Sequence, residues 1–276
     1  MLSIHRMISD DLGFALHLVE VEGWGEGRDE LERLLVYEPE GCFIAEVGEK
    51  PVGMVTTTSY GKLGWIGCLI VEPEKRGKGI GTELMRQALE YLEQKGVETI
   101  RLDAVQEAVS LYRRLGFTEE CRSLRFQGTG SRYDAPDVVP MEPSHLEDVS
   151  QLDAYCFGAD RSRLLRRVLQ DFPELCFVSY AQGKLAGYIM AKRTPTGGKI
   201  GPWVCRPDEL GRSRAEPLLR AALNALGDQL VSVGVLEDNR ASQETLRDYG
   251  FREGPWSCLL YTSDAADEGL GVDLGG

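Results

Sequence analysis

The sequence has no excess of positive charge. Its 276 residues include 44 Asp and Glu against 31 Lys and Arg, which gives a formal net charge of −13 and a pI near 4.8. Binding to nucleic-acid phosphates depends on clustered basic side chains. The composition therefore argues against a nucleic-acid partner and favours a soluble, acidic protein of the cytoplasm.

Long apolar runs are also missing. No stretch approaches the roughly 20 consecutive apolar residues that a membrane-spanning helix needs. The opening residues, MLSIHRMISDD, contain no apolar core of the kind found in secretory signal peptides. The sequence therefore predicts no membrane partner and a cytoplasmic location.

Potential metal ligands are few and scattered. The three histidines lie far apart, and none of the seven cysteines belongs to a Cys-x-x-Cys pair. Four cysteines lie inside strand-like apolar runs: Cys42, Cys68, Cys176 and Cys205. We expect reduced, buried thiols and no metal site.

One short pattern occurs twice in the chain. LYRRLGFTEE occupies positions 111–120, and LRDYGFREGP occupies positions 246–255. Around each copy the order of segments is the same: a strand, two helices, a hairpin, a strand, a long helix, a strand and a helix ending in Gly-Phe. The sequence therefore predicts a tandem duplication.

The duplication also predicts the domain organisation. We expect one domain over residues 1–128 and a second over residues 138–257. The segment between them, 129–137, belongs to a stretch rich in Gly, Pro and Asp and is predicted to be a linker. Each domain is expected to have an α/β (α+β) fold, with a mixed central sheet flanked by helices.

A glycine-rich run is present in the first copy only. Arg76-Gly77-Lys78-Gly79-Ile80-Gly81 stands between a predicted strand and a predicted helix. Glycines let the backbone approach a pyrophosphate closely, and the start of a helix presents free N–H groups to it. A P-loop is excluded because no Gly-Lys-Ser/Thr ending follows, and a Rossmann loop is excluded because the run follows the fourth strand.

The combination of motifs resembles the GNAT family of acyl-CoA-dependent N-acetyltransferases. LIVEPEKRGKGIG resembles the family's strand, Pro and Arg/Gln-x-x-Gly-x-Gly/Ala loop, and LYRRLGF resembles its Leu-Tyr-x-x-x-Gly-Phe helix end. LDAYCFGADR (152–161) resembles a pattern in a subgroup of the family whose members carry a second, divergent GNAT-like domain. The resemblance implies tandem GNAT folds and acetyl-CoA as the co-substrate.

The resemblance also implies which residues bind acetyl-CoA. Loop amides are expected to hold the pyrophosphate, and the end of the fourth strand is expected to pair with the pantetheine, with an N–H near Leu69 stabilising the oxyanion. The expected pantetheine contacts are Leu69, Ile70 and Val71. The expected loop contacts are Arg76, Gly77, Lys78, Gly79, Ile80, Gly81 and Thr82.

Tyr112 stands where the family has its general acid. A phenol can hydrogen-bond to the sulfur of CoA and protonate it as it leaves; otherwise Tyr112 is a packed aromatic residue. The general base is less defined, because the fourth strand carries no carboxylate. Asp103 is the first candidate, with a structural cap as its other reading, and Glu22 is the second.

Two tryptophans are candidates for an acceptor pocket. Trp24 and Trp65 supply flat apolar surfaces suited to a small acceptor, although each is also consistent with ordinary packing. The expected acceptor is a small-molecule amine.

The second copy is expected to be degenerate. Its corresponding segment, VCRPDELGRSRAEPLL, lacks the paired glycines, and we expect a helix over 215–226 with Pro217 in its first turn. Leu246 stands at the position of Tyr112. The second domain is therefore predicted to serve as structure or as part of an acceptor site.

The last residues carry a different signal. CLLYTSDAADE (258–268) resembles the translation of a sequencing-library adapter, and the residues after it are acidic and rich in glycine. We expect residues 258–276 to form an adapter-derived or disordered tail without packing against the fold. The alternative is that Leu259 to Tyr261 fall where the final strand should run and pair there by chance.

These observations leave three functions open. The first is transfer of an acetyl group from acetyl-CoA to a primary amine of a small molecule, by direct attack in a ternary complex. The alternatives are a non-catalytic acyl-CoA sensor and a protein N-acetyltransferase. A monomer or a homodimer is expected.

Overall fold

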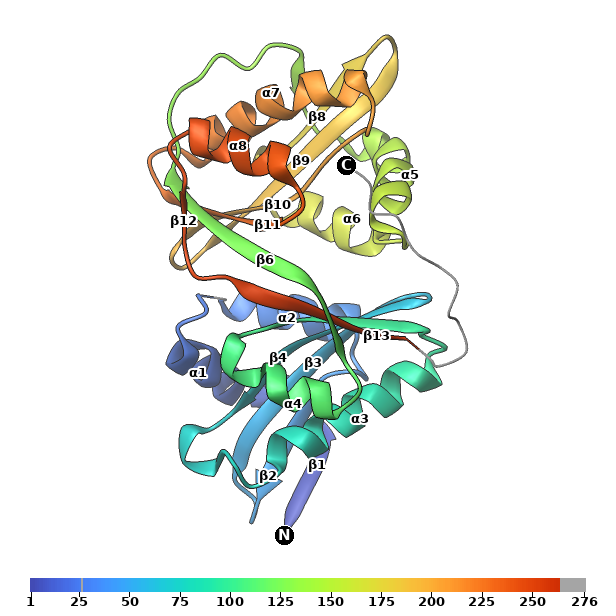
Figure 1. Ribbon diagram of the computed structural model, residues 1–276, viewed down its shortest axis with the longest axis vertical. Coiled ribbons are helices and arrows are strands. Elements are labelled where there is room, and N and C mark those ends of the chain that lie inside the picture. The colour runs from blue at the N-terminus through green and yellow to red at the C-terminus, as the bar shows by residue number, and fades with distance from the viewer. Residues whose placement is uncertain (26, 264–276) are drawn as a thin grey trace. The chain divides into compact units, whose positions relative to one another are not determined.

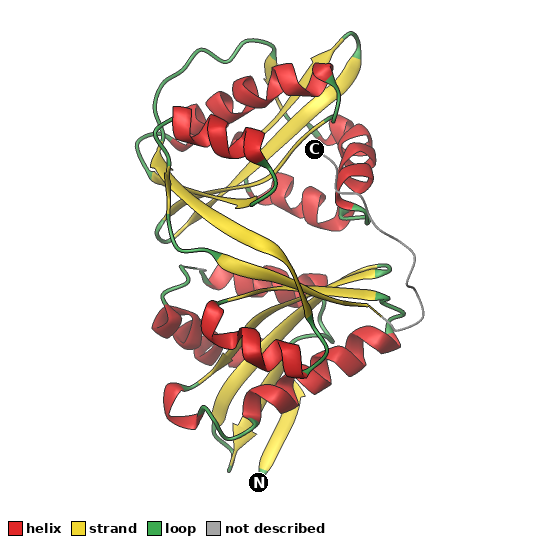
Figure 2. Ribbon diagram, in the orientation of Figure 1, coloured by secondary structure: helices red, strands yellow, loops and turns green. Residues whose placement is uncertain are grey.

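The two halves of the chain fold into units of the same architecture. The computed structural model describes residues 1–25 and 27–263. The first unit consists of Met1–Glu120 together with Cys258–Ser263, and the second consists of Cys121–Ser257. Each unit has a mixed sheet with helices packed on it (Figures 1 and 2), which confirms the predicted α/β class.

The first unit is built on a sheet of six strands in the order β1-β2-β3-β4-β5-β13. Neighbouring strands are antiparallel except for the β4–β5 pair, which is parallel. Its elements are β1 (Leu2–Arg6), α1 (Leu12–Glu22), α2 (Arg28–Tyr37), β2 (Phe43–Val47), β3 (Pro51–Tyr60), β4 (Leu63–Val71), α3 (Ile80–Gln94), β5 (Thr99–Ala104), α4 (Val109–Arg114) and β13 (Ser257–Ser263).

Helices cover both faces of this sheet. Ile44 and Met54 share a buried cluster with residues of α1 and α2. On the opposite face a Cβ at Gly64 would lie 3.1 Å from Leu92 of α3, so the sheet and this helix are in close contact. α3 forms because Leu84, Ala88 and Leu92 recur at helical spacing and are fully buried.

The second unit repeats this plan with the strand order β7-β8-β9-β10-β11-β6, and β12 pairs with β6. Its one parallel pair is β10–β11. Its elements are β6 (Thr118–Thr129), which begins at the end of the first unit, then β7 (Val138–Pro140), α5 (Leu146–Phe157), α6 (Ser162–Asp171), β8 (Cys176–Ala181), β9 (Lys184–Thr194), β10 (Gly197–Cys205), α7 (Glu209–Leu226), β11 (Leu230–Leu236), α8 (Arg240–Asp248) and β12 (Arg252–Glu253).

Each sheet is completed by a strand from the other half of the sequence. β13 lies beside β5 in the first unit, and β6 lies beside β11 in the second. The units therefore divide between Glu120 and Cys121, inside β6. The segment 129–137, expected as a linker, connects β6 to β7 within the second unit.

The predicted tail is wrong over Cys258–Ser263. These residues pair with β5 from Cys258↔Ala104 to Ser263↔Thr99. Leu259 and Leu260 are both buried, as in a strand that is covered on its two faces. Residues 264–276 of the predicted tail lie outside the described residues.

The start of α7 also differs from the sequence prediction. The helix begins at Glu209, six residues earlier than expected, because the Asp208 side chain accepts a hydrogen bond from the Gly211 N–H at 3.1 Å. Pro217 therefore lies inside the helix and not in its first turn. None of the helices described is both long enough and apolar enough to cross a membrane.

Candidate active site

The end of β4 is left open on one side. The parallel pairing of β4 with β5 runs from Leu63↔Thr99 to Ile66↔Leu102 and stops there. On the other side, β4 carries one extra residue between Gly67 and Ile70, and Cys68 has a φ of 47°. This β-bulge includes Leu69 and redirects the strand at the start of the predicted pantetheine contacts Leu69, Ile70 and Val71.

Backbone amides of β4 alternate between its two edges. The Glu72 N–H donates to the Val52 carbonyl of β3 at 2.9 Å. Because successive amides of a strand point to opposite sides, the N–H group of Val71 points towards the open edge, whereas Leu69 lies within the bulge, where this alternation is interrupted. The Ile70 side chain is buried on the sheet face that α1 covers and is part of the hydrophobic core. The sequence offered no clear signal for the bulge.

The glycine-rich run forms an open turn. Gly77 and Gly79 have φ values of 72° and 81°, in the left-handed region that favours glycine. A Cβ built at either position meets nothing within 4 Å. The backbone of this turn therefore borders free space, as close approach of a pyrophosphate requires.

The turn leads directly into the start of α3. Gly79 is its N-cap, and among the described residues no side chain caps the helix. The Glu83 N–H bonds to the Gly79 carbonyl at 3.1 Å, so the preceding amides, those of Ile80, Gly81 and Thr82, are available. Together with the helix dipole they form an arrangement suited to an anion.

Three elements of the site meet at Gly81. A Cβ at Gly81 would lie 3.8 Å from Val71 Cγ2 and 3.9 Å from Leu111 Cδ2. The open end of β4, the first turn of α3 and the helix α4 are therefore neighbours. The next residue after Leu111 is Tyr112, the predicted general acid.

Tyr112 is buried within this arrangement. Its ring packs edge-on against Phe117, with 5.9 Å between the ring centroids. Burial raises the pKa of Tyr112 to about 12, and no described side chain or backbone group hydrogen-bonds to its hydroxyl. The phenol is therefore protonated at neutral pH, and its O–H group is available to donate a hydrogen bond to a bound molecule.

The two basic residues of the loop are held by the protein. Lys78 Nζ donates to the Glu74 carbonyl at 3.0 Å, and Arg76 Nε donates to the Val71 carbonyl at 2.9 Å. The Arg76 guanidinium also pairs with Glu22, at the end of α1. No sequence pattern predicted this pair, which joins the second candidate base, Glu22, to the loop.

The other predicted site residues are Asp103 and Trp65, which lie in the sheet, and Trp24, which follows α1. In β5, Ile100 and Leu102 are buried on the sheet face that α3 covers, where they pair with Gly64 and Ile66 of β4. Because side chains of a strand alternate between its faces, Asp103 lies on the opposite face of the sheet. Trp65 shares that face because it alternates with Gly64. Trp24 is partly exposed and follows Glu22 by two residues.

The second unit has a helix where the first has the loop. The first turn of α7 fills the place of the glycine turn: a Cβ at Gly211 would lie 2.1 Å from the Arg206 carbonyl oxygen. Between Gly201 and Gly227 no residue has a positive φ. Leu246, the counterpart of Tyr112, is fully buried. This unit therefore has neither an open loop nor a hydroxyl at the acid position.

Among residues 1–25 and 27–263, no group of three or more His, Cys, Asp or Glu side chains is arranged to hold a metal ion.

Sequence comparisons identify the family of both units. Residues 7–117 match the model of the Acetyltransferase (GNAT) family, and residues 149–267 match that of an Acetyltransferase (GNAT) domain. The chain therefore belongs to the GNAT family, with two GNAT domains in tandem, and is an acyltransferase-family enzyme.

Two curated relatives align with much of the chain. An "Uncharacterized N-acetyltransferase YitH" of Bacillus subtilis is 24% identical over 253 residues, which is 89% of this chain and 86% of the relative. The "Holothin acyltransferase" of a Pseudoalteromonas species is 27% identical over 184 residues, 66% of this chain and 62% of the relative.

Solved structures support the tandem fold. A "Putative Acetyltransferase" from Pyrococcus horikoshii superimposes with a TM-score of 0.80 at 25% identity, covering 97% of this chain and 91% of that one. A tandem GNAT protein from the clavulanic acid biosynthesis pathway superimposes with a TM-score of 0.67 at 16% identity, covering 97% of this chain and all of the other.

Proposed function

We propose that the first unit transfers an acetyl group from acetyl-CoA to the primary amine of a small molecule. The observation that carries the proposal is the meeting, at Gly81, of the open strand end, the start of α3 and the helix that bears Tyr112. Acetyl-CoA supplies the acetyl group as an activated thioester.

The loop and the strand end divide the binding of acetyl-CoA between them. The amides of Gly77, Gly79 and the first turn of α3 hold the pyrophosphate, since a Cβ at either glycine meets no described atom within 4 Å and no described side chain caps the helix. The open edge of β4 offers the N–H group of Val71 to the pantetheine arm. The turn, the helix start and the strand edge therefore fit the co-substrate.

The transfer proceeds by direct attack in a ternary complex. The uncharged amine nitrogen bonds to the acetyl carbon, the carbon–sulfur bond breaks, and the nitrogen gives up a proton to Asp103 or to a water. The Leu69 N–H stabilises the negative charge that develops on the acetyl oxygen. Tyr112 donates its proton to the departing sulfur.

The raised pKa of Tyr112 affects how it acts. A phenol with a pKa of about 12 is a weaker acid than a free thiol of about 8.5. Burial also raises the pKa of a thiol beside Tyr112, and this reduces the difference in pKa between the phenol and the departing thiol. Tyr112 therefore contributes first as a hydrogen-bond donor to the developing thiolate and then as the source of its proton.

The acceptor class is supported by a relative whose name specifies its acceptor, the holothin acyltransferase, which aligns over 66% of this chain. The test is release of free CoA from acetyl-CoA, measured with a panel of small amines, amino acids and peptides with free N-termini. We expect turnover with at least one small amine. Turnover with peptides alone would contradict the acceptor class, and no turnover with any amine, despite acetyl-CoA binding, would contradict the proposal.

A further inference from the structure

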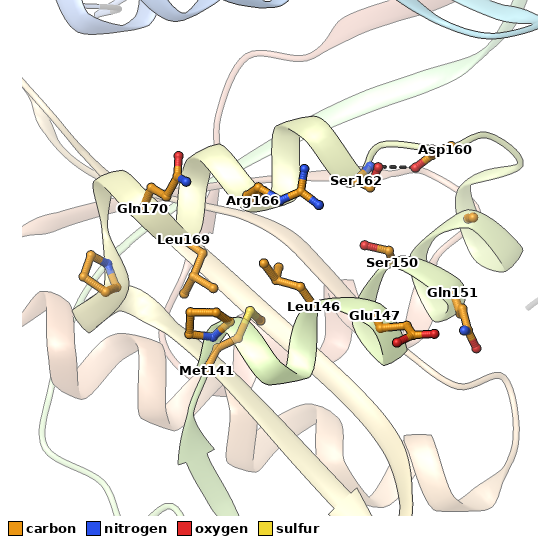
Figure 3. Close-up of a pocket in the computed structure, with 13 residues that line it drawn as sticks. Met141, Leu146, Glu147, Ser150, Gln151, Asp160, Ser162, Arg166, Leu169 and Gln170 are labelled. Carbon is orange, nitrogen blue, oxygen red and sulfur yellow. Dashed lines mark hydrogen bonds between the residues drawn. The ribbon is translucent and has the colours of Figure 1, made fainter.

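The second unit contains a cavity that the proposed transfer does not use. It lies between α5 and α6 and has a volume of about 780 Å³. Figure 3 shows Leu146 and Ser150 of α5 facing Arg166 and Leu169 of α6 across it. Cavities of about 300–1,000 Å³ are typical of sites for small molecules.

One part of the cavity is apolar. Met141 and Leu169 line it and belong to the buried core under α5 and α6. Leu146, Pro143 and Pro173 continue this surface. An apolar group placed here would leave water without losing a hydrogen bond.

A single basic side chain lines the cavity. Arg166 is exposed, and no described residue forms a hydrogen bond or a close ion pair with it. Its charge acts at longer range on Asp160, whose pKa is lowered mainly by hydrogen bonds from Ser162. Since Asp160 accepts the Ser162 N–H at 2.8 Å, that carboxylate is already engaged. Arg166 is therefore available for an outside anion.

The α5–α6 turn forms part of the cavity wall and is held by a buried carboxylate. Asp153 is fully buried and accepts two hydrogen bonds from Arg161, at 2.9 and 2.6 Å, and another from the Tyr188 hydroxyl. The Arg161 guanidinium lies over the Phe157 ring at 3.8 Å. These residues belong to the pattern LDAYCFGADR, so the pattern serves to fix the turn that carries Asp160 and Ser162 into the cavity wall.

We propose that this cavity binds a small carboxylate with an apolar body. The apolar body contacts Met141, Leu146 and Leu169, and the carboxylate pairs with Arg166, whose planar guanidinium suits two parallel hydrogen bonds. Glu147 also lines the cavity. An apolar α-amino acid therefore has a partner for each of its charges, whereas a simple carboxylate uses Arg166 alone.

The test measures binding to the intact protein without acetyl-CoA. Hexanoate, leucine, hexylamine and acetate are titrated while amide NMR shifts of α5 and α6 are followed. We expect hexanoate or leucine to bind and to shift these amides, and hexylamine and acetate to bind about tenfold more weakly or not at all. Tighter binding of leucine than of hexanoate would identify the amino acid as the ligand type.

Two matched variants locate the binding. Arg166→Gln removes the proposed partner from an exposed position and should weaken binding about tenfold, equivalent to one lost charge-assisted contact. Arg163→Gln makes the same change on the same helix away from the cavity and should leave the affinity unchanged. The proposal is overturned by equal binding of hexylamine and hexanoate, by an unchanged affinity in Arg166→Gln, or by no binding of either carboxylate.

Discussion

Arg76 Nε donates a hydrogen bond to the Val71 carbonyl at 2.9 Å while the same guanidinium pairs with Glu22. The side chain thus joins the loop to the end of β4 and to the end of α1. Part of the positive charge in the loop is neutralised before any phosphate arrives.

This pairing predicts an effect of Glu22 on acetyl-CoA affinity. In Glu22→Gln the negative charge is removed and Arg76 is released towards the pyrophosphate. Because a half-exposed pair is worth at most about 1 kcal/mol, we expect the Kd for acetyl-CoA to fall by a few-fold. Glu20→Gln, the same change two residues earlier on an exposed side chain, is the control. Weaker binding in Glu22→Gln alone would show that the pair is needed to shape the loop.

The pairing of β13 with β5 predicts that β13 stabilises the first unit against unfolding. Ending the chain after Ser257 removes the buried Leu259 and Leu260 and exposes the edge of β5. Burial of two leucines is worth on the order of 4 kcal/mol. Thermal unfolding should therefore show a melting temperature lower by roughly 10 °C. A chain ending after Ser263 keeps the whole strand and is the control; equal melting temperatures for the two chains would disprove a role for β13.

The raised pKa of Tyr112 predicts the alkaline side of the pH profile. With an acceptor amine whose pKa is about 8, kcat/KM should rise as the amine loses its proton and then stay level up to about pH 11. The folded pKa of Tyr112 is raised, so its contribution to stability is complete below about pH 10 and is lost as the pH approaches 12. Circular dichroism must therefore confirm folding at each pH. A decline with a pKa near 10 in folded protein would contradict the buried state of Tyr112.

Tyr112→Phe tests the hydroxyl while keeping the ring packed against Phe117. Loss of a general acid should lower turnover by about 10²–10⁴-fold and leave the affinity for acetyl-CoA nearly unchanged. Steady-state rates with a competent amine are compared with acetyl-CoA affinity and melting temperature in both proteins. Turnover within a few-fold of the parent would reduce Tyr112 to a packing residue.

The sequence was sufficient for the features that depend on local patterns. The loop glycines and the spacing of Leu84, Ala88 and Leu92 are local signals, and the structure has a glycine turn and a helix at those positions. A final strand at Leu259 to Tyr261 was only the alternative to the predicted tail, because strand pairing joins segments far apart in sequence and no local pattern specifies the partner.

The early start of α7 was missed for another reason. Asp208 is a helix-capping residue visible in the sequence, but alignment with the first copy places a loop there. The structure shows that a helical turn replaces the loop, because the backbone at Gly211 lies so close to the Arg206 backbone that a Cβ there would clash with it. The Glu22–Arg76 pair likewise needed the fold, since it joins α1 to a loop more than fifty residues away.

The central claim is that the first unit alone binds acetyl-CoA, through the glycine turn. Isothermal titration of the intact chain with acetyl-CoA tests it most directly. We expect one site per chain, no binding in Gly79→Val, and normal binding in Gly61→Val, which places the same side chain at a glycine of similar φ in the β3–β4 turn. Two equivalent sites per chain, or an unchanged affinity in folded Gly79→Val, would contradict the claim.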